Sequence, residues 1–255
     1  MDLQAEPGFP KRAESGDKIF AKGPWKQEPT NRRVRALVGG QWLFDTLQAE
    51  YVWEHPYFPT FYVPLTAIEA GPGNVTKETY DHGGRWSGTL SVGDRAIPMT
   101  GYDQGTLRGL VHLPPSAMDA WFEEDERLLG SHPKDPYKRI DCLPSSREVR
   151  IEVDGVVVAR STDNVFLHET GLRTRYYLSP TSIVDWTMLS PSSTTSVCPY
   201  KGEASYYHVK VGEKEIKDAI WYYKYPTTES ARIQNRLCFY NEKVDVFIDG
   251  VKEGS

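Results

Sequence analysis

From Arg33 onward, short runs of alternating apolar and polar residues dominate the chain, and glycine, proline, asparagine and aspartate separate them. This period of two residues is typical of half-buried β-strands. Residues 33–38 and 41–45 are two such runs, and Gly39-Gly40 joins them. A two-residue turn of this kind needs positive φ angles, which glycine adopts without strain, so we predict a β-hairpin here.

The same pattern returns 115 residues later, where residues 149–153 and 156–160 flank an Asp154-Gly155 turn. At this offset the chain aligns with itself without a gap over 35 positions. The matched pairs include Val34 and Val149, Gly40 and Gly155, Thr46 and Ser161, Glu54 and Glu169, Tyr62 and Tyr177, and Ile68 and Ile183. The match resumes at larger offsets, with His82-Gly83 on Lys201-Gly202, Val92-Gly93 on Val211-Gly212, Leu110 on Leu237, and Ala120-Trp121 on Val246-Phe247. Self-similarity at so long a period predicts a duplicated domain and not a solenoid.

We therefore predict a mainly β protein of two tandem homologous antiparallel β domains, each a half-open, half-barrel-like sheet of about six strands, with a pseudo-twofold between them and few short helices. The predicted boundaries are an irregular N-terminal arm (1–31), a first β repeat (32–130), a linker (131–146) and a second β repeat (147–255). Within the second repeat we expect a strand at 206–211, a turn at Gly212-Glu213 and a final strand at 237–240. A ligand would bind in a cleft between the sheets or inside the curve of each.

The one helical candidate is the short acidic segment 116–129. Its run of acidic residues, 123–126, is interpreted as a solvated helix face or loop, because charge runs usually lie in water.

Composition is typical of a folded protein, with 39% hydrophobic, 12% aromatic and 25% charged residues. The 30 basic and 35 acidic side chains give a formal charge of −5 without a run of five basic residues, so we expect no nucleic-acid partner. Cys142, Cys198 and Cys238 are odd in number and widely spaced, which argues against a disulfide framework and favours a reducing compartment. No apolar run has the length of a signal peptide or a membrane span. We expect a cytoplasmic monomer or homodimer without a membrane partner.

The histidines show no metal-ligand spacing, and cysteine pairs of the Cys-x-x-Cys type are absent. The sequence also contains no Gly-x-Ser-x-Gly elbow and no dinucleotide fingerprint. We therefore expect neither a metal nor a cofactor.

Four segments together resemble one family: 119–126, 132–141, 198–202 with the sequence Cys-Pro-Tyr-Lys-Gly, and 239–245. They are similar to family 427 of the domains of unknown function in its two-domain form, from about Arg33 to Gly250. The resemblance implies a compact, mostly β domain that is compared with the β-tent folds and is present twice. It also brings the catalogue label "nucleotidyltransferase".

The sequence departs from what this resemblance implies at several points. Nucleotidyl transfer needs metal-holding carboxylates and a phosphate cradle, and the chain has neither a Gly-Ser with a following Asp-x-Asp nor a Gly-rich loop ending in Lys-Ser/Thr. In the first repeat, Tyr80-Asp81-His82-Gly83 replaces the motif at 198–202, and nothing there corresponds to Trp221-Tyr222-Tyr223. Either only the second repeat keeps an ancestral site, or the first has acquired its own.

The richest candidate chemistry lies at 194–207 and 221–226. Lys201 precedes a glycine and has aromatic neighbours, whose burial would lower its pKa toward that of a reactive amine. The alternative is a lysine whose amine pairs with Glu203 or Glu242. Cys198 is either a nucleophile that needs a base or a buried thiol.

Glu54 and Glu169 hold equivalent places, each ahead of an aromatic strand. Aromatic surroundings would raise the pKa of a carboxyl and suit a general acid or base. The alternative is a structural carboxylate bonded to Arg35 in the first repeat or to Arg150 in the second.

The aromatic residues of 221–225 alternate between the two faces of a strand, with Trp221, Tyr223 and Tyr225 on one face. They suit a flat apolar ligand with a polar handle, or plain core packing. The catalytic candidates are Lys201, Glu169 and Tyr207. The substrate-binding candidates are Trp221, Tyr223, Tyr177, Thr195, Cys198, Tyr200 and Tyr240, together with Glu54 and a possible polar wall of His82, Arg85 and Trp86 in the first repeat.

Three functions fit these residues. The first is a cofactor-free intracellular enzyme that acts on a partly aromatic or polyketide-like small molecule by general acid/base chemistry, as in isomerisation, cyclisation, hydration or hydrolysis. The second is a non-catalytic module that binds a small molecule or a partner. The third follows the family's label, a nucleotidyltransferase.

Overall fold

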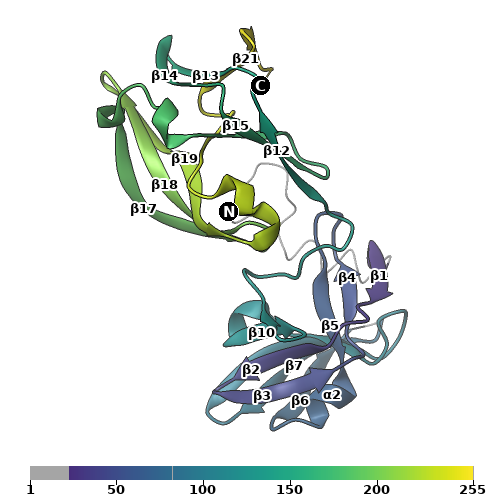
Figure 1. Cartoon of the computed structure of the whole chain (residues 1–255). Helices are drawn as coiled ribbons and strands as arrows, with labels where there is room; N and C mark the ends of the chain where they lie inside the picture. Colours follow the sequence, from purple (N-terminus) through teal and green to yellow (C-terminus); the bar gives the residue numbers. More distant parts are fainter. Residues whose placement is uncertain (1–22, 82, 255) are drawn as a thin grey trace. The chain divides into compact units, whose positions relative to one another are not determined.

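The computed structural model describes residues 23–81 and 83–254 (Figure 1). This part of the chain divides after Asp135 into two compact units, called here the first unit (to Asp135) and the second unit (from Pro136). The predicted arm 1–31 lies outside the described residues as far as residue 22, and its last part contains a strand, Lys26–Pro29. The predicted linker likewise contains a strand, Ile140–Ser145.

The first unit consists of two antiparallel sheets. Its strands are β1 (Lys26–Pro29), β2 (Val34–Val38), β3 (Gln41–Thr46), β4 (Glu50–Trp53), β5 (Thr60–Pro64), β6 (Asn74–Tyr80), β7 (Arg85–Val92), β8 (Arg95–Tyr102), β9 (Leu110–His112), β10 (Ala120–Glu123) and β11 (Glu126–Arg127). Seven of them form a sheet in the order β1-β4-β5-β9-β8-β7-β6, and four form a sheet in the order β11-β10-β2-β3. The short helices of this unit are α2 (Leu65–Glu69) and the 3₁₀ turn η2 (Pro115–Ala117).

The second unit repeats this architecture. Its strands are β12 (Ile140–Ser145), β13 (Val149–Val153), β14 (Val156–Ser161), β15 (Asn164–Glu169), β16 (Arg175–Leu178), β17 (Leu189–Cys198), β18 (Gly202–Val211), β19 (Lys214–Pro226), β20 (Leu237–Phe239), β21 (Asp245–Ile248) and β22 (Val251–Lys252). The 3₁₀ turns are η3 (Pro180–Ser182), η4 (Trp186–Met188) and η5 (Thr228–Ile233). The sheet orders are β12-β15-β16-β20-β19-β18-β17 and β14-β13-β21-β22.

Strand for strand, these are the orders of the first unit, so the predicted mainly β fold of two homologous antiparallel domains is confirmed. The prediction of one sheet of about six strands per domain was too simple, because each unit divides its strands between a large and a small sheet.

The two predicted hairpins are present and closely alike. In β2–β3 the turn residues Gly39 and Gly40 have φ angles of 59° and 75°, and in β13–β14 Asp154 and Gly155 have 50° and 77°. Both pairs therefore have the positive φ angles of a type I′ turn, whose twist matches that of the flanking strands. Each hairpin also has a register shift after its third residue, Ala36 in the first unit and its counterpart 115 residues later in the second.

The helix predicted over 116–129 is wrong. Only η2 is helical there, and the rest of the segment is the β10–β11 hairpin, with Glu124 in its turn at a φ of 50°. The acidic run thus lies in a solvated turn, except for Glu123, which is buried. The Glu123 carboxylate accepts hydrogen bonds from the Tyr51 hydroxyl and, at 3.1 Å, from Arg32. The segment is thus held as strand by the pairing of β10 with β2 and by the tertiary contacts of Glu123.

The predicted final strand is β20, but two further strands follow it, and β21 pairs with β13. The ladders also revise the alignment of the repeats. Trp121 lies opposite Ala36, and Val246 lies opposite Ile151, so Trp121 and Val246 are equivalent. The offset at this strand is therefore 125, one less than the sequence alignment suggested.

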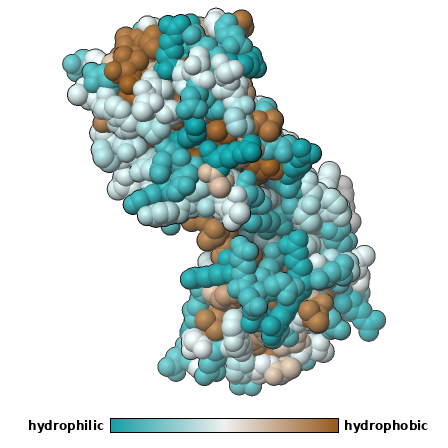
Figure 2. Space-filling view, in the orientation of Figure 1, coloured by the Kyte–Doolittle hydropathy of each residue, from teal (hydrophilic) through white to brown (hydrophobic). Residues whose placement is uncertain are grey.

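Each unit has its main core between its two sheets, since buried residues of both sheets contribute to one cluster. The opposite face of each large sheet carries a second buried cluster, called here the outer face. On the side of the molecule drawn in Figure 2, hydrophobic residues appear as separate patches among hydrophilic ones. Buried apolar side chains are thus concentrated in these two layers of each unit. On the outer faces, polar groups lie beside them.

Candidate functional site

The β17–β18 turn brings a lysine onto the outer face of the second unit. Cys198 ends β17, and Gly202, with a φ of 106°, begins β18. A side chain at Gly202 would place its Cβ 2.9 Å from the carbonyl oxygen of Tyr225, so the close approach of β19 requires glycine here. Because the turn is this tight, the side chains of Cys198 and Lys201 lie together.

Lys201 forms a buried ion pair with Glu169, the last residue of β15. Lys201 Nζ lies 2.5 Å from Glu169 Oε2 and 3.8 Å from Cys198 Sγ. The Lys201 and Glu169 side chains are 12% and 6% exposed. Burial alone would lower the pKa of Lys201, but the nearby Cys198 and Glu169 raise it above its usual value.

Lys201 is therefore an ammonium at neutral pH. The expectation of a lowered lysine pKa is wrong, because the effect of burial is outweighed by the interactions with Cys198 and Glu169. The ion-pair partner is Glu169 and neither Glu203 nor Glu242. Glu169 in turn is not bonded to Arg150, which pairs with Glu152.

A floor of buried aromatic rings adjoins the ion pair. Trp221 Nε1 donates to the Tyr177 hydroxyl at 2.9 Å, and the rings of Trp221 and Tyr240 are 4.4 Å apart. Burial raises the pKa of Tyr177 and of Tyr223 well above the usual value, so both are neutral phenols. Cys198 and Glu169 lie close enough to Tyr223 to contribute to its shift. Among the described residues, the Tyr223 hydroxyl has no hydrogen-bond partner, and its side chain is buried.

Two residues of this floor were missed at the level of sequence. Arg175 lies over the rings of Trp221 and Tyr240, at 5.4 and 5.8 Å, and bonds Glu242 at 3.0 Å. Tyr206 shares a 2.6 Å hydrogen bond with Ser196 Oγ. Arg175 could have been found from the sequence, because it lies two residues before Tyr177 and therefore on the same face of β16.

Other candidates lie elsewhere. Tyr207 is on the opposite face of β18 from Tyr206, where it stacks on Tyr222 at 5.3 Å, so it does not meet Lys201. Thr195 is exposed, and it lies opposite Ser205 on that same far face. Tyr200 is buried beside the ion pair, and its carbonyl accepts a hydrogen bond from the Ser230 hydroxyl at 3.1 Å, which ties η5 to the turn.

The first unit has a related but different outer face. Glu54 accepts hydrogen bonds from Tyr62 at 3.1 Å and Thr60 at 3.3 Å, and it is not bonded to Arg35, whose carboxylate partner is Asp125. Counting along the paired strands places Tyr102 where the second unit has Tyr223. The expectation that nothing in the first repeat answers Trp221-Tyr222-Tyr223 is therefore wrong for the last of these three.

The predicted polar wall of the first repeat is not one surface. Arg85 and Trp86 are neighbours on β7 and so face opposite ways. Trp86 is buried in the main core, where its Nε1 donates to Asp103 at 3.2 Å, while Arg85 lies opposite Tyr102 on the outer face. His82, the third member, lies outside the described residues.

Within 23–81 and 83–254, no group of three or more His, Cys, Asp or Glu side chains has the arrangement of a metal site. In the same part of the chain, no helix has the length and apolar character needed to cross a bilayer.

Comparison with protein families gives one result. The sequence profile described as domain of unknown function 427 (DUF427), with the short name NTP_transf_9, matches residues 26–87 and 141–250. The chain belongs to the DUF427 family. The second matched segment begins in β12 and ends after β21, so it spans nearly a whole unit, while the first ends within β7. Comparison with curated proteins gives no match.

Proposed function

We propose that the second unit is an enzyme that acts on a small, partly aromatic molecule by general acid/base chemistry, with Lys201 and Glu169 at its centre. The observation that carries this proposal is the buried 2.5 Å contact between the ammonium and the carboxylate beside neutral tyrosines. A solvent-exposed ion pair would stabilise developing charge on a substrate far less, because water screens its charges.

The groups divide into a proton acceptor and proton donors. The Glu169 carboxylate is placed to take a proton from a carbon next to a carbonyl group of the substrate. The Lys201 ammonium and the Tyr223 hydroxyl donate to the oxygen on which negative charge then develops. Neutral phenols of high pKa suit this role, because they stay protonated while they stabilise an oxyanion. The proton returns to another atom of the substrate, so that an isomerisation or cyclisation is complete without a co-reactant.

A non-catalytic small-molecule-binding module is the second candidate, and one observation favours it. The pKa values of Lys201, Tyr177 and Tyr223 all shift upward, away from neutrality. Groups that exchange protons rapidly with a substrate usually have pKa values near the working pH. The same face would then hold an aromatic ligand against Trp221 and Tyr240 without turnover.

Proton transfer itself provides the test. The protein is incubated in D₂O with a panel of small aromatic ketones, and exchange of the protons next to the carbonyl is followed by ¹H NMR. We expect exchange that falls by at least about 10²-fold in Glu169→Gln, since a positioned base typically contributes this much. Lys201→Met should also lose exchange, whereas Lys224→Met, at an exposed lysine on β19, should retain it.

Three other outcomes would contradict this proposal or part of it. Binding of a ketone without exchange in the wild-type protein supports the binding module and contradicts the enzyme. Equal exchange in the wild type and Glu169→Gln removes Glu169 from the chemistry. A thermal shift that requires a nucleotide and magnesium would instead support the third candidate, a nucleotidyltransferase.

A further inference from the structure

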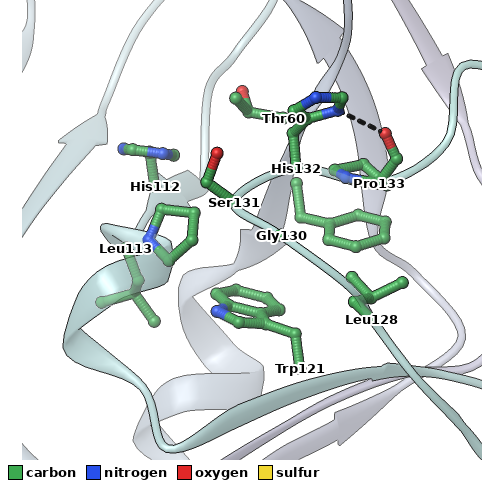
Figure 3. A pocket seen from close by; sticks show the side chains of 11 residues that line it. Thr60, His112, Leu113, Trp121, Leu128, Gly130, Ser131, His132 and Pro133 are labelled. Atoms are coloured by element: carbon green, nitrogen blue, oxygen red, sulfur yellow. Dashed lines mark hydrogen bonds between the residues drawn. The ribbon is translucent and has the colours of Figure 1, made fainter. Parts of the chain in front are cut away.

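The first unit contains a pocket that has no residue in common with the site proposed in the second unit. It is lined by Thr60, Phe61, His112, Leu113, Pro115, Trp121, Leu128, Gly130, Ser131, His132 and Pro133. The centre of a water-sized sphere can occupy about 20 Å³ of it, and the space not filled by atoms, including a part open to solvent, is about 300 Å³. Space of this size for a sphere's centre has room for about one water-sized group. Figure 3 shows the Trp121 indole on one side of the pocket, with Ser131 and His112 across from it.

Trp121 brings an unused hydrogen-bond donor to this pocket. Its side chain is only 7% exposed, and its Nε1 has no hydrogen-bond partner among the described residues. The ring cannot easily turn to find one, because it stacks on Phe61 at 5.7 Å and meets Phe44 edge-on at 5.5 Å. Buried N–H groups are nearly always paired in native proteins, so an acceptor is expected at this place.

The fold itself does not require this indole. The equivalent residue of the second unit is Val246, which fills the corresponding place on β21 with an apolar side chain. An apolar residue there costs no unsatisfied polar group. The N–H of Trp121 is therefore a feature of the first unit alone, as expected for a group that serves a ligand.

The lining residues limit the charge of that ligand. None of them is Lys, Arg, Asp or Glu. The apolar side chains include Phe61, Leu113 and Leu128, and the polar groups are hydroxyls, imidazoles and one indole N–H. Such a surface suits a ligand without a formal charge, since a buried charge needs a partner of opposite sign.

We propose that the first unit binds a small uncharged carbonyl compound in this pocket. The carbonyl oxygen enters at the buried wall of the pocket and accepts a hydrogen bond from Trp121 Nε1. The hydrocarbon body lies toward Phe61 and Leu128 and leaves by the open side, where Ser131 is exposed. This site is independent of the one proposed for the second unit and holds whether or not that unit is an enzyme.

The indole N–H signals of the full chain report on this site directly. The sequence has seven tryptophans, and Trp121→Phe identifies the Trp121 signal in a ¹H–¹⁵N spectrum by its loss. The probes are cyclopentanone and the shape-matched hydrocarbon cyclopentane. We expect cyclopentanone to move the Trp121 N–H signal saturably and several-fold further than any other indole signal. Cyclopentane, which has no acceptor oxygen, should shift it far less.

Two variants complete the experiment. Trp121→Phe keeps a ring against Phe61, and it should retain the fold but lose saturable cyclopentanone binding. Trp42→Phe, at a 45% exposed tryptophan of the same unit, is the matched control and should bind normally. The proposal is overturned if all indole signals move alike and without saturation, or if Trp121→Phe binds cyclopentanone as tightly as the wild type.

Discussion

At the scale of single residues, the Lys201–Glu169 pair combines the cost of burying two charges with the attraction between them. Taking an ammonium and a carboxylate out of water is costly, and their short contact offsets that cost only while both are present. Loss of one partner leaves the other as a buried, unpaired charge. The pair is therefore sensitive to single substitutions in stability as well as in the proposed chemistry.

We predict that Lys201→Met lowers the free energy of unfolding by about 3–5 kcal/mol, the usual cost of breaking a buried ion pair. The double variant Lys201→Met/Glu169→Leu should recover most of this loss, because neither charge remains. Urea unfolding of the three proteins measures both effects.

An exposed ion pair of the same unit is the control. Lys214 and Asp154 are 50% and 61% exposed, and Lys214→Met should cost no more than about 1 kcal/mol. If Lys201→Met were as mild as this control, the contact with Glu169 would not be a buried ion pair in solution.

At the scale of elements, the hairpin turns show how far local sequence determines this fold. The second unit has Asp154 at the position where the first has Gly39, and both residues have positive φ angles. Glycine loses more backbone freedom on folding than asparagine or aspartate, which tolerate this conformation better than other side chains. The first unit therefore contains a less constrained version of the same turn.

Gly39→Asn should raise the free energy of unfolding by roughly 0.4–1 kcal/mol, because it restricts the unfolded chain in a conformation that the turn permits. No atom lies within 4 Å of the new Cβ position. Asparagine is preferred to aspartate here because the Asp119 carboxylate already accepts a hydrogen bond from the Gly40 N–H. Gly39→Val should instead destabilise the protein, since β-branched residues are outliers at positive φ. Thermal unfolding compares the two, and equal melting temperatures would contradict the assigned turn.

The same elements show what the sequence could not supply. The hairpins were predictable because Gly39-Gly40 and Asp154-Gly155 act through local backbone preferences. Segment 116–129 was not, because its strand β10 depends on pairing with β2 and on the buried carboxylate of Glu123. Such contacts are remote in sequence and override local propensity.

The candidate site followed the same rule. The motif at 198–202 and the equivalence of Glu54 and Glu169 singled out Lys201 and Glu169 as candidates, and the structure brings these two side chains together. Their direct contact was not predicted, because it joins β15 to the β17–β18 turn, which are far apart in the chain. Tyr207 was chosen although Tyr206 is the residue on the outer face, because the sequence shows that neighbours face opposite ways but not which face carries the site.

At the scale of the whole molecule, the two units share their sheet orders but differ in the side chains that line their pockets and outer faces. Both units have the same sheet orders, yet Trp121 stands where the second unit has Val246. Both outer faces retain a tyrosine pair, Tyr62 with Tyr102 and Tyr177 with Tyr223. The strand ladders tolerate these changes because their backbone hydrogen bonds form whichever of these side chains a residue carries.

These buried phenols give the molecule a common response to alkali. Burial raises the pKa of tyrosines in both units above the usual value; they are Tyr51, Tyr62, Tyr102, Tyr176, Tyr177, Tyr223 and Tyr240. A group whose pKa is higher in the folded than in the unfolded state stabilises the fold fully below the unfolded pKa. That stabilisation is lost as the pH rises above it, and the raised pKa of Lys201 acts in the same direction.

We therefore expect stability to fall steeply above about pH 10, where unfolded tyrosines ionise. Absorbance at 295 nm should rise in two steps, first from tyrosines in contact with water and then from the buried set. The second step should coincide with the loss of the near-ultraviolet circular dichroism, because the buried phenols ionise only when the chain unfolds. If all fifteen tyrosines ionised in one step near pH 10 while the circular dichroism stayed native, the outer faces would be open to water in solution.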